Sequence, residues 1–214
     1  MVKLDIISDP VCPWCYIGKV QLDRALEAAP DHPFTVEWHP FQLNPDMPAE
    51  GMDRRDYLRA KFGGEEGAAK VYAEVADAAE AAGLALDLGA IRRQPNTLDA
   101  HRLIHWAGIE GRQTAAVSAL FAAYFKEGRD IGDRETLADI ADRIEMDASV
   151  VHRLLESGAD VEETRARERA AREMGVTGVP TFIVGGQHAV PGAQPPELWA
   201  RVIAELGAEG AREG

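Results

Sequence analysis

Two cysteines separated by two residues are the most reactive feature of the sequence. Cys12-Pro13-Trp14-Cys15 follows a short apolar run at residues 4–7 and precedes a stretch with helical periodicity. A cysteine at the start of a helix faces unpaired backbone N–H groups and the positive end of the helix dipole, which stabilise a thiolate. Cys15 lies one turn further on, where it can attack a mixed disulfide formed at Cys12. The pair predicts thiol–disulfide exchange, with Cys12 as nucleophile and Cys15 as resolving thiol, and this chemistry requires no cofactor.

A strand, a helix and a second strand must position these two thiols. The apolar run at residues 4–7 is too short for a helix and suits a buried strand. Apolar residues between positions 16 and 26 recur at three- and four-residue spacings, which predicts a helix that starts near Pro13 and stops before Pro30. Apolar and polar residues then alternate over 34–39, as in a strand. The intervening helix is the crossover that parallel pairing of the two strands requires.

The middle of the chain, residues 46–159, is Ala-rich, charged and interrupted by glycines, which predicts an inserted helical subdomain. Asn96 is expected to cap one of its helices. Asp160 and Glu163 have the spacing of a capping box, and we expect them to start a further helix that ends at Gly175.

The C-terminal part carries the signals of a hairpin and a closing helix. Residues 180–191 contain two short extended segments joined by Gly185-Gly186, a typical hairpin turn. A last helix is expected to begin near Pro196 and to end at residue 206. Residues 207–214 are expected to fray.

The peptide bond between Val179 and Pro180 admits two interpretations. Proline at the first residue of a strand removes no ladder donor, so an ordinary trans proline would need no functional explanation. A cis bond would leave the Val179 backbone free to pair with an extended peptide. The CxxC pair in the same chain favours the cis interpretation.

Four segments in order resemble the DsbA family of thioredoxin-fold proteins, and within it the cytoplasmic FrnE-like oxidoreductases. The segments are Ser8-Asp-Pro-Val-Cys-Pro-Trp-Cys-Tyr-Ile-Gly-Lys19, Trp38-His-Pro-Phe-Gln-Leu-Asn-Pro45, Asn96-Thr-Leu-Asp-Ala-His-Arg102 and Gly192-Ala-Gln-Pro-Pro196. The resemblance implies an α/β thioredoxin-like domain, formed by residues 1–45 and 160–206 and interrupted by an all-α insertion at 46–159. It also implies a cis Pro180 beside the two cysteines.

The same superfamily leaves two other functions open. It contains 2-hydroxychromene-2-carboxylate isomerases and kappa-class glutathione transferases, which carry Ser where this chain has Cys12; that difference counts against a purely glutathione-dependent isomerase or transferase. The resemblance implies that glutathione could act as a co-substrate, in contact with the Val179 backbone and with the helix start near Gln194. Relatives commonly carry an acidic residue in place of Gln194. The remaining alternative is a non-enzymatic module that senses oxidation or binds proteins as a chaperone does.

Four further residues are candidates to shape the active site or bind substrate. Pro13 and Trp14 lie between the cysteines, and we expect Trp14 to provide an apolar contact beside the reactive sulfur. Asn96 and His101 share one short helical stretch. They either cap a helix and fill the subdomain interface or face Cys12 across a cleft, where they would bind substrate.

Asp9 and His39 are candidates to accept the proton of Cys15 during resolution. A carboxylate or imidazole near the thiol could act as the base, although Asp9 is equally a turn residue because it precedes a proline.

Composition narrows the class of protein. The chain has 214 residues with 46% hydrophobic and 28% charged residues, as in ordinary globular proteins. A net charge of −13 opposes nonspecific binding to nucleic acid. Two cysteines are too few for a disulfide scaffold or a four-cysteine zinc site, and no metal is expected.

The cellular location is predicted from the length of the apolar stretches, and the partners are predicted from the number of cysteines. No apolar stretch reaches the roughly 18 residues of a membrane helix, and no signal peptide is recognisable, so a cytoplasmic protein with no membrane contact is expected. Because both cysteines lie in one CxxC, an external redox partner must reduce or reoxidise them, and protein or small-molecule thiols and disulfides are the expected substrates. The Ala-rich apolar faces are also compatible with a homodimer.

Overall fold

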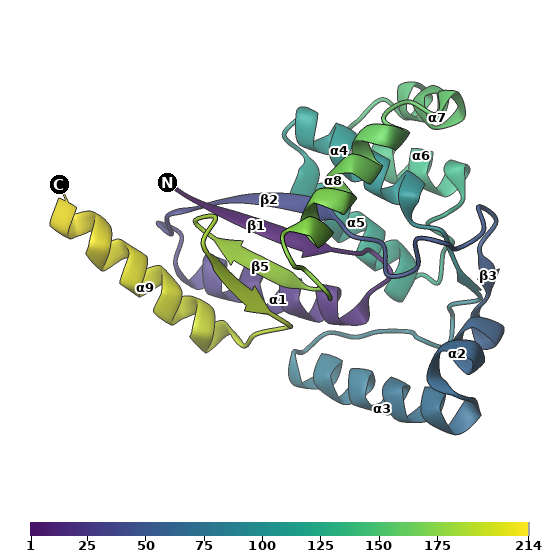
Figure 1. Cartoon of the computed structure of the whole chain (residues 1–214), viewed down its shortest axis with the longest axis horizontal. Coiled ribbons are helices and arrows are strands. Elements are labelled where there is room, and N and C mark those ends of the chain that lie inside the picture. Colours follow the sequence, from purple (N-terminus) through teal and green to yellow (C-terminus); the bar gives the residue numbers. More distant parts are fainter. Residues whose placement is uncertain (214) are drawn as a thin grey trace.

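A mixed four-stranded sheet joins the two ends of the chain in the computed structural model, which describes the backbone of residues 1–213 and the side chains of residues 1–208 (Figure 1). The sheet order β2-β1-β5-β6 comprises β1 (Val2–Ser8), β2 (Phe34–Pro40), β5 (Thr181–Val184) and β6 (His188–Pro191). β1 pairs in parallel with β2 and antiparallel with β5. The predicted strands and hairpin are confirmed, with both turn glycines at positive φ.

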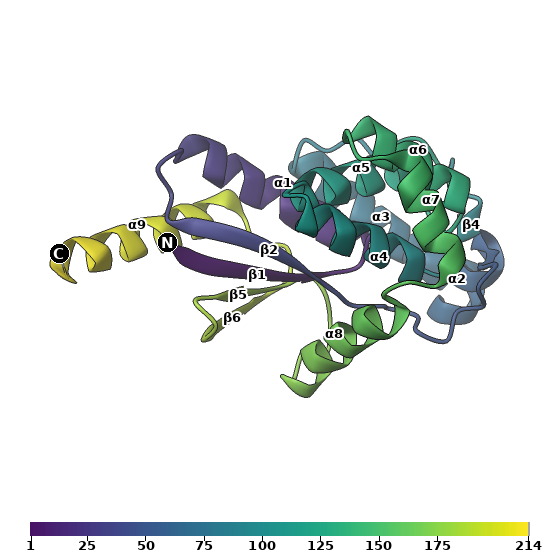
Figure 2. The same ribbon diagram turned by 90° about the horizontal axis from the view of Figure 1, so that it is seen from above.

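Helices cover both faces of this sheet (Figure 2). α1 (Pro13–Ala28) and α9 (Pro196–Glu213) lie on one face and α8 (Val161–Glu173) lies on the other. α9 is anchored by Trp199, which is fully buried and meets the Phe182 ring edge-on at a centroid distance of 4.8 Å. α1 connects the parallel strands β1 and β2, so the crossover helix predicted between the first two strands is confirmed.

The C-terminal helix is longer than the sequence pattern indicated. α9 continues through Glu213, so the fraying expected from residue 207 does not occur over 207–213; position 214 lies outside the described residues. This stretch contains Gly207 and Gly210 beside Ala, Glu and Arg, so neither apolar periodicity nor helix propensity indicates its helical conformation.

The inserted segment gathers beyond the end of the sheet at which β1 and β2 terminate (Figures 1 and 2). Its helices are α2 (Arg54–Phe62), α3 (Glu65–Ala81), α4 (Leu98–Ile109), α5 (Gln113–Phe125), α6 (Arg134–Arg143) and α7 (Ala148–Ser157). It is not purely helical, because β3 (Met52–Asp53) pairs antiparallel with β4 (Arg93–Gln94). Strands of two residues are too short to give a periodic signal in the sequence.

One continuous apolar core joins the insertion to the sheet. Tyr16 of α1 stacks on Phe121 of α5 with centroids 4.8 Å apart and an interplanar angle of 8°. Phe125, one turn further along α5, contacts both rings. The first turns of α1 are thus packed directly against the insertion. The exact domain boundaries at residues 46 and 159 stay a prediction.

The predicted caps are only partly correct. Asn96 Oδ1 accepts the Leu98 N–H at 2.9 Å, as expected of a residue that caps α4. Asp160 forms no capping box: it has a positive φ of 57°, and its Oδ2 accepts the indole N–H of Trp106 at 2.7 Å. Gly175 lies just after α8 with a φ of +89°, as expected of a helix stop. In the described part of the chain, no helix combines the length and apolar character needed to cross a membrane.

Candidate active site

The two cysteines lie where the loop after β1 enters α1. Cys12 is the residue that precedes the helix, with φ −89° and ψ 114°, and Pro13 occupies the first helical position. Proline is suited to that position because its φ is already helical and its missing N–H would have no partner there. The carbonyl of Cys12 accepts the N–H groups of Cys15 and Tyr16. Cys12 therefore lies at the positive end of the helix dipole, as the sequence predicted.

Both thiols are reduced and almost entirely buried. Cys12 is 4% exposed and Cys15 is 1% exposed, and neither forms a disulfide. Burial raises the pKa of the Cys15 thiol well above its ordinary value, and the neighbouring Cys12 sulfur raises it further. The Ser8 side chain and the Asp9 backbone act in the opposite direction but do not prevail. Cys15 is thus protonated at neutral pH in this conformation.

The segment that precedes β5 lies directly beside Cys12. The Val179–Pro180 peptide is cis, and the carbonyl of Val179 accepts a hydrogen bond from Cys12 Sγ at 3.7 Å. Gly18 allows the close approach of α1 to this segment. A Cβ at position 18 would lie 3.2 Å from Pro180 Cγ and 3.3 Å from the Phe182 ring.

The surface next to the thiols is apolar and rich in backbone groups. Trp14 is 37% exposed, so its indole remains available for contact with a bound molecule. A groove of about 520 Å³ runs along the segment from Met174 to Thr181 and reaches Pro191 and Gly192 of the hairpin. Met174 is 67% exposed at its border. Val179 lines this groove, and its carbonyl is the group that the Cys12 sulfur contacts.

Asp9 and His101 lie behind the dithiol rather than in an open cleft. The Asp9 carbonyl accepts the Cys12 N–H at 2.9 Å, and its Oδ2 accepts the Leu43 N–H at 2.8 Å. His101 Nε2 lies 3.6 Å from Asp9 Oδ1, and the two side chains are 2% and 1% exposed. The structure therefore agrees with the interface alternative for His101, because the imidazole is enclosed between insertion and sheet, and a role in binding substrate stays a prediction.

The Asn96 side chain likewise forms hydrogen bonds within the protein. Its Nδ2 donates to the carbonyl of Met47 at 2.6 Å, and its Oδ1 accepts from Gln42 Nε2 as well as from the Leu98 N–H. These bonds use both acceptor sites of Oδ1 and one of the two Nδ2 N–H groups, as expected of the structural alternative, and substrate binding by Asn96 stays a prediction. Gln194 donates to the carbonyl of Pro191 at 2.6 Å and so supports the turn before α9.

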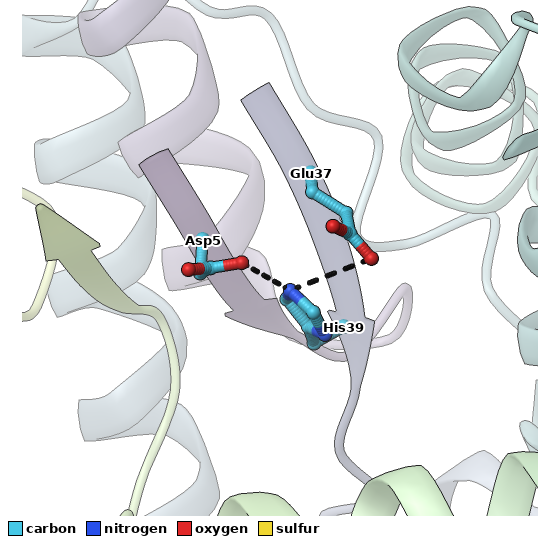
Figure 3. Close-up of side chains that lie close together, drawn as sticks. All are labelled: Asp5, Glu37 and His39. Atoms are coloured by element: carbon cyan, nitrogen blue, oxygen red, sulfur yellow. Dashed lines mark hydrogen bonds and ion pairs between the residues drawn. The ribbon is translucent and has the colours of Figure 1, made fainter. Parts of the chain in front are cut away.

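His39 belongs to an ion-pair network rather than to the Cys15 environment (Figure 3). Its Nε2 lies 2.6 Å from Asp5 Oδ1 and 3.8 Å from Glu37 Oε1, and these groups could in principle hold a cation. However, Lys3 lies within 2.9 Å of both carboxylates, and Arg167 of α8 pairs with Glu37 at 2.8 Å. These cations neutralise the two carboxylates. The cluster therefore fastens α8 to the sheet, and the role of His39 as a base for Cys15 is not supported.

Sequence reasoning missed Ser8, whose side chain faces Cys15. Residues alternate between the two faces of a strand, so Ser8 shares the α1 face with the buried Leu4 and Ile6. This alternation could have indicated that the hydroxyl at the end of β1 points toward the helix that carries the thiols.

Comparisons with known proteins identify a family and relatives that this chain resembles in sequence and fold. A family model described as DSBA-like thioredoxin domain matches residues 3–204. The structure of the probable DsbA oxidoreductase SCO1869 from Streptomyces coelicolor is 33% identical, with 98% of this chain and 91% of that chain covered and a TM-score of 0.85. The uncharacterized protein YwbO of Bacillus subtilis (strain 168) is 27% identical over 206 residues, which cover 95% of this chain and 96% of that protein.

Two more distant structures share the fold. A 2-hydroxychromene-2-carboxylate isomerase is 18% identical with a TM-score of 0.76, and 99% of each chain is covered. The cytosolic disulfide reductase DsbM from Pseudomonas aeruginosa, solved with GSH, is 17% identical with a TM-score of 0.69, and 95% of this chain and 98% of that chain are covered. With the family match over almost the entire chain, the protein belongs to the family of DsbA-like thioredoxin-domain proteins.

Proposed function

We propose that this chain is a thiol–disulfide oxidoreductase in which Cys12 and Cys15 are the reacting groups. The observation that carries the proposal is the position of Cys12, which combines the start of α1 with a contact of 3.7 Å between its sulfur and the Val179 carbonyl. A thiolate at that point is stabilised by the helix, and a peptide placed along Val179 brings its own sulfur to Cys12.

The exchange proceeds in two balanced steps. The Cys12 thiolate attacks one sulfur of a substrate disulfide, the substrate S–S bond breaks, and its other sulfur leaves as a thiolate. Cys15 then loses its proton and attacks the Cys12 sulfur, which releases the second substrate thiolate and forms the Cys12–Cys15 disulfide. The substrate gains two electrons and the enzyme loses two. The reverse sequence donates a disulfide to a substrate dithiol.

An external thiol couple must regenerate the site, since Cys12 and Cys15 are the only cysteines of the chain. We propose glutathione as a low-molecular-weight partner in this role. The similar fold of DsbM, a cytosolic disulfide reductase solved with GSH, supports the proposal, and it also supports a cytoplasmic location.

Trapping of the mixed disulfide tests this function. Cys15→Ser should accumulate a covalent adduct at Cys12 with disulfide-containing peptides and with oxidised glutathione, detected as a mass increase that dithiothreitol removes. Cys12→Ser is the matched control and should form no adduct. The wild type should reduce insulin with glutathione present.

Other outcomes would place the chain in a different functional class. If Cys12→Ser binds glutathione and isomerises 2-hydroxychromene-2-carboxylate, the chain is a glutathione-dependent isomerase, which the structural likeness to that enzyme makes the second candidate. If the wild type neither reduces insulin nor oxidises reduced proteins, while Cys12→Ala still prevents aggregation of a client protein, the chain is a binding module.

A further inference from the structure

Asp9 and His101 form a buried titratable pair that the exchange steps described above do not use. Asp9 Oδ1 and His101 Nε2 face each other at 3.6 Å, and within the described residues neither atom has a hydrogen-bond partner. Buried polar atoms of native proteins are nearly always bonded, because an unsatisfied one costs roughly 1–3 kcal/mol. Two such atoms facing each other form a place where a proton can be held.

The pair is connected to the thiols through short contacts. Asp9 accepts the N–H of Cys12 through its carbonyl, while its backbone and the Ser8 side chain act on the Cys15 sulfur. An internal cavity of about 10 Å³ is bordered by Ser8 and His101, and a volume of that size holds at most about one water molecule. Ser8 is therefore the residue shared by the Cys15 sulfur and by the cavity that His101 borders.

The resolving step requires such an acceptor. Cys15 is 1% exposed, so bulk water does not reach its sulfur freely. Burial raises the pKa of this thiol, so at neutral pH the proton must be removed during the attack on Cys12. A base within the protein would lower that barrier.

We propose that Asp9 and His101 together take up the proton of Cys15 when the mixed disulfide is resolved. The inference rests on the proposed function. In the step, the Cys15 S–H bond breaks, its proton passes to the Asp9–His101 pair, the new Cys12–Cys15 bond forms, and the substrate leaves as a thiolate. His101 belongs to α4 of the insertion, so the inserted segment completes the redox site that the sheet and α1 begin.

The other titratable groups nearby are already engaged. His39 borders the same cavity, but its ring nitrogens lie against Asp5 and Arg167. Tyr124, whose pKa burial raises far above neutrality, donates its hydroxyl to the carbonyl of Arg93. Arg102 follows His101 in the sequence but donates to the carbonyls at the end of α7.

Reaction with 5,5′-dithiobis(2-nitrobenzoate) separates the two steps in one experiment. The first thionitrobenzoate is released when Cys12 attacks the reagent, and the second when Cys15 resolves the mixed disulfide. Asp9→Asn retains an oxygen for the Leu43 N–H, and His101→Gln retains a polar side chain. Each variant should slow the second phase by about 100-fold near pH 7, in line with the usual contribution of general-base catalysis. The first phase should change by less than about threefold, since the proposal concerns Cys15 alone.

The pH profile distinguishes proton transfer from a structural effect. At alkaline pH the solvent itself deprotonates Cys15, so the variants should approach the wild-type rate. The double variant should be no slower than either single variant, because the pair acts as a unit. His105→Gln, a change one turn along α4 at a side chain bonded to Arg167, should leave both phases unchanged.

Several results would overturn the inference. One is a second phase within threefold of wild type in both variants, and another is a deficit that does not diminish with pH. A wild type without a first phase would instead refute the proposed function, on which the inference depends. If the variants fail to fold, Ser8→Ala takes their place: it removes the hydroxyl that faces Cys15 and borders the same cavity as His101, so the second phase should slow, and an unchanged second phase would contradict the proposal.

Discussion

At the scale of single residues, both thiols are buried but they have different neighbours. Cys15 is 1% exposed, and burial keeps its proton bound at neutral pH by raising its pKa. Cys12 is 4% exposed and lies at the helix start, with its sulfur on the Val179 carbonyl. The contact with Val179 therefore distinguishes Cys12 from Cys15.

The raised pKa of Cys15 predicts how stability depends on pH. The folded protein keeps this proton to a higher pH than the unfolded chain, whose thiol ionises near the ordinary value of 9.0. The stabilising contribution is therefore complete below that pH and is lost as the pH rises toward the pKa of the folded state. In this window the free energy of unfolding of the reduced protein should fall by up to about 1.4 kcal/mol per pH unit through this group.

Urea denaturation of the reduced protein between pH 7 and pH 10 measures that loss. Cys15→Ser removes the thiol, so the difference between wild type and variant isolates it from lysine and tyrosine titrations. If the difference in free energy of unfolding between wild type and variant stays constant from pH 7 to pH 10, folding does not raise the pKa of Cys15.

At the scale of elements, the contact between α1 and the segment before β5 decides whether the thiols meet the Val179 backbone. Gly18 is the residue that permits it, because a Cβ there would lie 3.2 Å from Pro180 and 3.4 Å from the Ala193 backbone. α9 packs on the same side of α1. A larger side chain at position 18 would therefore displace α1 from Pro180 and disturb its packing against α9.

Gly18→Val should force α1 away from Pro180. We expect the free energy of unfolding to fall by roughly 1–3 kcal/mol, the usual cost of overpacking, and the rate of insulin reduction to fall with it. Glu27→Val, on the exposed last turn of α1, controls for the lower helix propensity of a β-branched residue. Equal losses in the two variants would mean that the contact with Pro180 is unimportant.

Arg102 ties α4 to the end of α7. Its guanidinium is fully buried and donates to the carbonyls of Ala159 and Leu154, each at 2.6 Å, and to Asp99. Leu154 lies in the last turn of α7 and Ala159 just after the helix, where backbone carbonyls lack N–H partners from a following turn and a cation is favourable.

Arg102→Leu should lower the free energy of unfolding by about 1–3 kcal/mol, because it removes the side-chain donor of the Ala159 and Leu155 carbonyls, while Asp99 keeps Arg134 and the Leu154 carbonyl keeps Ser157. Thermal unfolding followed by circular dichroism checks this expectation. Arg153→Leu, at an exposed position of α7, should lower the free energy of unfolding by less than about 0.5 kcal/mol. A comparable loss in both variants would show that Arg102 does not stabilise the contact between α4 and α7.

At the scale of the whole molecule, the insertion and the thioredoxin-like unit share one core. The Tyr16–Phe121 stack lies at their junction, and the apolar cluster extends from β1 to α7. Cooperative unfolding is expected of parts that share a core in this way. It also explains how a histidine of the insertion can lie within 3.6 Å of a carboxylate beside the thiols.

Phe121→Ala removes a fully buried ring from this junction and should cost about 3–5 kcal/mol. In a Trp106→Phe background, which removes the tryptophan of the insertion, fluorescence reports on the thioredoxin-like unit through Trp14, Trp38 and Trp199, while the far-ultraviolet signal reports mainly on the helices. The two transitions should shift together in urea. Separate midpoints for the two probes would show that the insertion folds independently.

The sequence by itself determined the order of the elements and predicted a dithiol site at the start of α1. The spacing of Cys12 and Cys15 and the periodicities around them act over a few residues, so the first strand, the crossover helix, the second strand and the hairpin were all predictable. The end of α9 was not, because the apolar spacing stops at residue 206 and the glycines at 207 and 210 disfavour the helix that continues to Glu213.

Tertiary structure decided which polar residues surround the thiols. Asn96 and His101 are five positions apart on one segment, yet the first bonds to Met47 and the second faces Asp9. His39 was a reasonable base for Cys15 in the sequence but pairs with Asp5 on the α8 face of the sheet. Burial and orientation of a side chain depend on which distant elements pack against it, and local spacing carries no information about them.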